Sequence, residues 1–79
     1  MNLELIASAY VNCVDLEERA HAESPPLSED LANLRADLHA LWMRSLQEAG
    51  IAFTDRSDAA RMAYEFVRKQ RKVASQSGF

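Results

Sequence analysis

Residues 27–50 read LSEDLANLRADLHALWMRSLQEAG, with a large apolar residue at almost every third or fourth position. At 100° per residue, this spacing gathers the leucines and Trp42 on one face of a helix. Ser28, followed by two acidic residues, is expected to cap that helix at its start. The pattern predicts a helix over about residues 28–49.

Two interruptions bound this helix and divide the chain into three segments. The prolines at 25–26 disfavour helix in the residue before them, so the first helix is expected to end near Glu23. Gly50 can adopt the left-handed conformation that closes a helix. A Schellman motif at this glycine would bring Ile51 into contact with Leu46.

Both flanking segments show the same helical spacing. The first carries an apolar stripe that begins at Leu3, and the third begins after Thr54 or Asp55, either of which can cap a helix. The fold is therefore predicted to be all-α, a three-helix bundle. Its predicted parts are helices at about residues 3–22, 28–49 and 55–74 in one domain spanning 1–74, and a disordered C-terminal tail at 75–79.

The composition limits where this chain can work and what it can hold. The one cysteine, Cys13, has no partner for an intramolecular disulfide, which favours a reducing compartment. His21 and His39 have no second ligand at metal spacing on their own helices. No signal peptide and no apolar run of membrane-spanning length is apparent. We therefore expect a cytoplasmic protein with no metal, no cofactor and no membrane contact.

The residues that could carry catalysis all have simpler interpretations. Cys13 lies on an apolar helix flank, where a small buried residue is the common explanation. Asp55 and Asp58 stand at a helix start, where capping and the helix dipole account for both. Trp42 and Tyr10 fit core positions. The sequence therefore predicts no enzyme and no small-molecule substrate.

The first helix is apolar over more than half of its circumference, which is more than one small core requires. A chain of 79 residues buries only about 60% of its unfolded surface, and scaffolds of this size often need a second subunit. We therefore expect a homodimer that also binds an unidentified protein, as a non-catalytic interaction module acting as a regulator, inhibitor or adaptor. The predicted interface residues are Leu5, Ala9, Leu16 and Ala20 in the first helix and Ala32, Ala36 and Met43 in the second.

Charge is divided unevenly along the chain. Residues 1–55 hold ten acids and three bases, a net charge of −7, whereas residues 56–79 hold two acids and six bases, a net charge of +4. One interpretation is a solvated third helix with ion pairs along its surface. The alternative is a helix that contacts nucleic-acid phosphate or an acidic protein. The residues for that contact are Arg61, Arg68, Lys69, Arg71 and Lys72.

Overall fold

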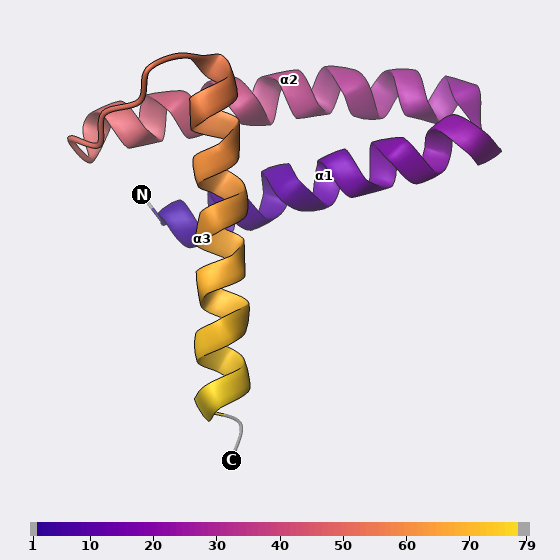
Figure 1. The fold of residues 1–79 in the computed structure, drawn as a ribbon. Helices are drawn as coiled ribbons and strands as arrows, with labels where there is room; N and C mark the ends of the chain where they lie inside the picture. Colours follow the sequence, from indigo (N-terminus) through magenta and orange to yellow (C-terminus); the bar gives the residue numbers. More distant parts are fainter. Residues whose placement is uncertain (1, 78–79) are drawn as a thin grey trace.

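The computed structural model describes the backbone of residues 2–77 and the side chains of residues 2–69. It contains three helices, α1 (Leu3–Glu23), α2 (Pro25–Glu48) and α3 (Arg56–Ser77), and no β-strand among the described residues. Helices α1 and α2 lie side by side as an antiparallel hairpin, and α3 crosses that hairpin (Figure 1). The all-α, three-helix prediction is confirmed. The third helix lies across the other two instead of alongside them, which gives a flat molecule of 37 × 34 × 20 Å.

The hairpin turn is a single residue, Ser24, which ends α1 and begins α2. Its N–H donates to the Ala20 carbonyl at 2.7 Å, and its own carbonyl accepts the N–H of Ser28 at 3.0 Å. The prediction that α2 starts at Ser28 was wrong, because this serine is buried within the helix. The prolines at 25–26 occupy the first turn of α2, where their missing N–H groups need no partner.

The end of α2 is the Schellman motif that the sequence predicts. Gly50 has a φ of 75°, a conformation that strains residues with a side chain. Its N–H donates to the Gln47 carbonyl at 3.1 Å, and the N–H of Ile51 donates to the Leu46 carbonyl at 2.9 Å. The side chain of Ile51 packs against the core, so the loop to α3 leaves the helix in a fixed direction.

The start of α3 is capped from both sides. The Asp55 carboxylate accepts the N–H of Asp58 at 2.8 Å, and the Asp58 carboxylate accepts the N–H of Thr54 at 3.0 Å. The predicted capping roles of both aspartates are confirmed. The helix continues to Ser77, beyond its expected end at 74, and the rest of the expected tail, residues 78–79, lies outside the described part of the chain.

The core forms where α3 crosses the hairpin. Trp42 is fully buried there, as predicted, and Leu46 lies beside it. Alanines fill the remaining contact positions, with Ala7 on α1 facing Ala59 and Ala63 on α3 in the same buried cluster. Small side chains let crossing helices approach closely, since the interaxial distance depends on the residues at the contact.

Two polar side chains of α2 bind the first turns of α3. The Trp42 indole Nε1–H donates to the Ala59 carbonyl at 2.7 Å, and His39 Nε2 donates to the Arg56 carbonyl at 3.0 Å. The Trp42 ring also meets Phe66 edge-on, with ring centroids 5.4 Å apart. These contacts determine where along α2 the third helix begins its crossing.

Replacing Trp42 with Phe should destabilise the fold although the site stays aromatic. The substitution removes the N–H donor and leaves a cavity, which together lower the free energy of unfolding by about 1–3 kcal/mol. Chemical denaturation followed by circular dichroism measures this loss. The control is Tyr64→Phe, which removes a hydroxyl from a half-exposed ring and should shift stability by less than about 0.5 kcal/mol. Equal stability of the Trp42→Phe variant and the unmodified chain would contradict the assigned role.

Candidate interaction surfaces

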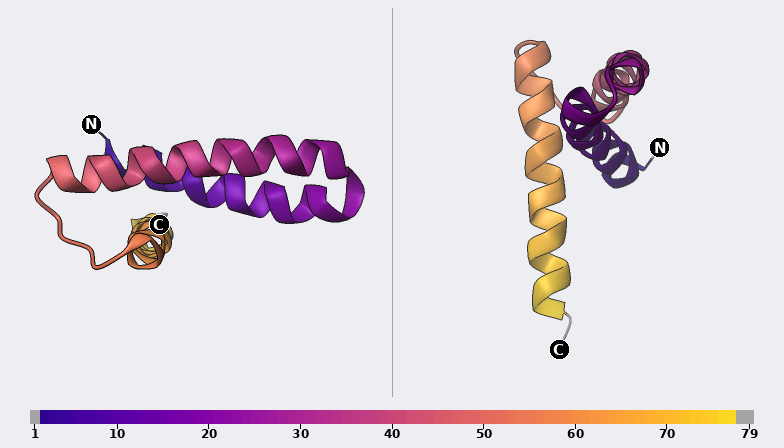
Figure 2. Two further views of the ribbon diagram at one scale, coloured as in Figure 1. Left: turned by 90° about the horizontal axis from the view of Figure 1, so that it is seen from above. Right: turned by 90° about the vertical axis from the view of Figure 1, so that its right-hand side faces the viewer.

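Helix α3 covers one side of the hairpin and leaves the opposite side open (Figure 2). Val11 and Val14 of α1 lie beside Tyr64 of α3, so they are on the side of α1 that α3 covers. Leu5 and Leu16 lie about half a helical turn away from these valines, together with Ala9. The two leucines are 68% and 49% exposed, so the outer side of α1 presents apolar side chains to water.

Helix α2 adds two leucines to the same open side. The backbone of α2 at Leu31 adjoins α1, because the Leu31 carbonyl accepts the Cys13 thiol, and His39 lies on the side of α2 that contacts α3. Leu27 and Leu34 lie to the other side of Leu31 on the helix surface and are 50% and 48% exposed. We refer to Leu5, Leu16, Leu27 and Leu34 as the leucine strip.

The leucine strip differs from the interface that the sequence predicts. Ala20 is buried, because it lies about two turns from Cys13 on the face of α1 that packs on α2, and Met43 is half-buried against the core. Ala32 is half-buried, and Ala36 is exposed on the side of α2 opposite the leucine strip. These four residues are therefore not part of one exposed surface with the predicted residues Leu5, Ala9 and Leu16.

The sequence pattern puts Leu27 and Leu34 on the same helix face as Trp42, an apolar stripe that fits the core, so it does not identify them as surface residues. The stripe does exist, but α3 crosses near the other end of α2, at His39 and Trp42. The part of the stripe near the hairpin turn therefore has no third helix over it (Figure 1). The leucine stripe is longer than one crossing helix can cover. This length was the signal in the sequence that part of the stripe stays exposed.

The α3 side of the hairpin carries two adjacent grooves of about 410 and 400 Å³ between α3 and the hairpin turn. Both grooves share Val14 and Glu18, and together we call them the corner groove. His21, exposed at the end of α1, lines the part nearest the hairpin turn. The remaining lining residues are Tyr10, Val11, Asn12, Asp15, Glu17, Ser28, Arg35 and Tyr64.

The corner groove combines an aromatic wall with an acidic rim. Tyr10 links the wall to the core, since its ring stacks on His39 and meets Tyr64 edge-on at a centroid distance of 6.4 Å. Burial raises the pKa of the Tyr64 hydroxyl, and the nearby Tyr10 and Glu18 raise it further. The phenol therefore stays neutral at physiological pH beside the carboxylate.

Glu18 stands out among the carboxylates of this rim. Glu17 forms an ion pair with Arg35 across the hairpin, and Asp15 approaches Arg19 at 3.4 Å on an exposed surface. Glu18 forms no ion pair with any residue whose side chain the structure describes. The rim therefore keeps a negative charge available to a ligand.

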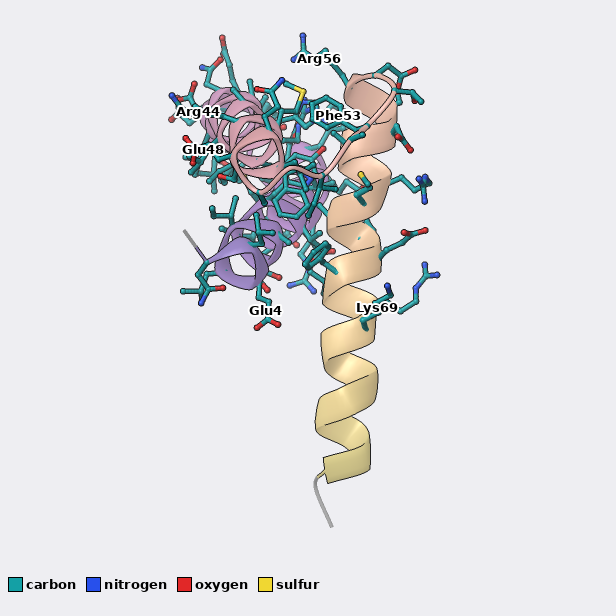
Figure 3. All side chains as sticks on the ribbon, turned by 90° about the vertical axis from the view of Figure 1, so that its left-hand side faces the viewer. Glu4, Arg44, Glu48, Phe53, Arg56 and Lys69 are labelled. Atoms are coloured by element: carbon teal, nitrogen blue, oxygen red, sulfur yellow. The ribbon has the colours of Figure 1, made fainter. Side chains whose placement is uncertain are left out.

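The basic residues of α3 fall into two groups. Arg61 is ion-paired with Asp58 and Glu65 on its own helix, as the solvated-helix interpretation expects. Arg68 and Lys69 are exposed and pair with no acid among the described side chains, and Lys69 lies on a side of α3 turned away from the hairpin (Figure 3). The predicted contacts Arg71 and Lys72 lie outside the described side chains.

Cys13 occupies a closed site between the hairpin helices. The thiol is buried and donates to the Leu31 carbonyl at 3.4 Å. Burial raises the pKa of Cys13, and the negative charge of Glu17 raises it further. Both effects reduce the thiolate fraction, which is the reactive form. The predicted interpretation as a small buried residue is confirmed.

Cys13 alkylation by iodoacetamide should therefore be slow in the native chain. At pH 8 the rate is expected to be roughly 100-fold lower than in urea, because the hairpin must open before the thiol reacts. Mass spectrometry of timed samples measures both rates. Native and unfolded chains that react equally fast would show that Cys13 is not enclosed by the two helices.

Two other kinds of site find no support among the described residues. No three His, Cys, Asp or Glu side chains are grouped as metal ligands there. None of the helices there has the length and apolar character needed to cross a bilayer. In comparisons with known proteins, no family model, no curated protein and no solved structure matched the chain.

Proposed function

We propose that this chain is a non-catalytic helical interaction module that works by occupying a surface of another protein, as a small regulator, inhibitor or adaptor. The observation that carries this proposal is the leucine strip. Four leucines, each about half exposed or more, lie on one side of the hairpin. Exposed apolar residues gathered on one side of a small domain are typical of a protein-binding surface.

The energetics favour burial of this strip in a complex. Complete burial of a leucine side chain stabilises a protein by about 1.5–3 kcal/mol. Burying the four partly exposed leucines in a complex would therefore contribute several kcal/mol to the free energy of binding. Ala9, exposed between Leu5 and Leu16, is small enough to let a partner helix approach α1 closely. The proposal includes a homodimer, and the leucine strip is one surface on which two copies of the chain can associate.

Nucleic-acid binding by the basic third helix is the competing proposal and has less support. Two carboxylates of α3 neutralise Arg61, so it is not free to contact phosphate without losing those pairs. The exposed Arg68 and Lys69 are its main structural support. Phosphate contacts would make binding weaken steeply with salt, whereas a leucine interface tolerates salt.

Glutamate at Leu16 or Leu34 should abolish association through the strip while leaving the fold intact. The free energy of unfolding of the monomer is expected to change by less than about 1 kcal/mol, because both side chains are about half exposed. Sedimentation equilibrium of the purified chain and pull-down from its native host measure self-association and partner binding. Circular dichroism melts measure the stability.

Two control variants separate surface effects from effects on the fold. Ala40→Glu adds the same charge at an exposed site on another side of α2 and should leave all binding unchanged. Leu46→Ala, in the core, should cost about 2–5 kcal/mol of stability. The proposal fails if neither strip variant changes any association, or if Ala40→Glu has the same effect as Leu16→Glu.

A further inference from the structure

The C-terminal part of α3 extends beyond the hairpin. The helix has 22 residues, a length of about 33 Å. Val67 is the last buried side chain among those described, and the ribbon continues from there past α1 into open space (Figure 1). The two described side chains after Val67, those of Arg68 and Lys69, are exposed and are available to a partner from outside the protomer.

The sequence of this projecting part is both basic and partly apolar. Arg68 and Lys69 are followed by Arg71 and Lys72, and then by Val73 and Ala74. Such a segment fits a site with an acidic rim and an apolar wall. The corner groove has those two properties, in Glu18 and Asp15 on its rim and Val11, Val14 and Tyr64 in its wall.

The corner groove lies beside α3, where the α3 helix of a second copy can reach it. The part of the groove next to α3 is lined by residues of α1 and by Tyr64 of α3, and these two helices cross at an angle (Figure 1). If the two-fold axis is perpendicular to α3, the α3 of a second copy runs antiparallel to the first. The basic end of that helix would then approach α1 at Asp15 and Glu18, and the same contact would be repeated at the other end.

We propose that the corner groove binds the basic C-terminal part of α3 from a second copy of the chain, and that the two copies exchange this contact in a closed, symmetric dimer. Each end of the dimer pairs Glu18 of one copy, which has no ion pair among the described side chains, with Arg68 or Lys69 of the other. A two-fold interface of this kind closes on itself and leaves no free end for further growth.

Two parts of the same sequence carry opposite charges, which indicates that the occupant of the corner groove is a second copy of the chain. The hairpin and the loop after it carry −7, whereas the remaining residues carry +4. No ion pair among the described side chains joins the basic end of α3 to the corner groove of its own protomer. This surface is separate from the leucine strip, which lies on the other side of the hairpin, so the two can be tested independently.

The experiment is a charge exchange in the full chain, followed by sedimentation equilibrium. Glu18→Lys alone and Lys69→Glu alone should each weaken the dimer about tenfold or more, because each places like charges together at both ends. The double variant, Glu18→Lys with Lys69→Glu, should restore most of the affinity. Raising NaCl from about 50 mM to about 500 mM should weaken the unmodified dimer, since exposed charges are screened.

Matched controls come from exposed charges on α2 that lie away from α3 (Figure 3). Glu48→Lys and Arg44→Glu make the same charge changes outside the corner groove and should leave the dimer unchanged. A monomeric unmodified chain at low salt would overturn the proposal. So would a dimer that ignores salt and both single variants but is lost in Leu16→Glu, which would leave the leucine strip as the self-association surface.

A last experiment tests nucleic acid as the alternative ligand of the basic C-terminal part of α3. Binding of a duplex DNA probe that is lost in Lys69→Glu, without any self-association of the chain, would also overturn the proposal. Circular dichroism melts accompany every variant. All the substituted side chains are exposed, so melting temperatures close to that of the unmodified chain are expected.

Discussion

Two hydrogen bonds from side chains of α2 to the backbone of α3 fix the point at which α3 crosses the hairpin. The rest of the structure depends on this crossing point. Trp42 donates to the Ala59 carbonyl, and His39 donates to the Arg56 carbonyl. Both donors are buried, where an unmade hydrogen bond is expensive, so α3 cannot slide along α2 without losing them. The crossing point therefore stays at one end of α2, and the other end of the hairpin is left without a third helix.

The open surfaces follow from this crossing point. On the side of the hairpin away from α3, Leu16 and Leu34 stay in contact with water. On the α3 side, the crossing helix and α1 form an angle that Tyr64 and Glu18 line as the corner groove. The two surfaces differ in how binding through them depends on salt. Binding through the apolar strip is insensitive to salt, whereas binding to the acidic rim weakens as salt is added. One protomer can therefore offer two separable contacts.

The local parts of this fold could be predicted from the sequence. Periodic apolar residues indicate each helix, and Gly50 and Asp55 mark a helix end and a helix start through backbone requirements that neighbouring residues satisfy. The start of α2 differs from the prediction because the prolines at 25–26, which disfavour helix in the residue before them, are accepted within a first helical turn.

The non-local parts could not be predicted in the same way. Helical spacing shows which residues share a face, but it does not show which neighbour covers that face or over what length. Ala20 and Leu34 both lie on apolar faces, yet one packs inside the hairpin and the other is exposed. The corner groove depends on the crossing of α3, which the bonds of His39 and Trp42 determine. No residue spacing within one helix encodes that crossing.

Hydrogen exchange of the Trp42 indole Nε1–H tests the crossing point most directly. The chain has one tryptophan, so this proton gives a single indole resonance. The structure predicts exchange far slower than that of a free indole, at a rate that follows global unfolding, because the donor is fully buried and bonded to the Ala59 carbonyl. Exchange at the rate of a free indole, in a chain that keeps its full helical signal, would contradict the assigned position of α3.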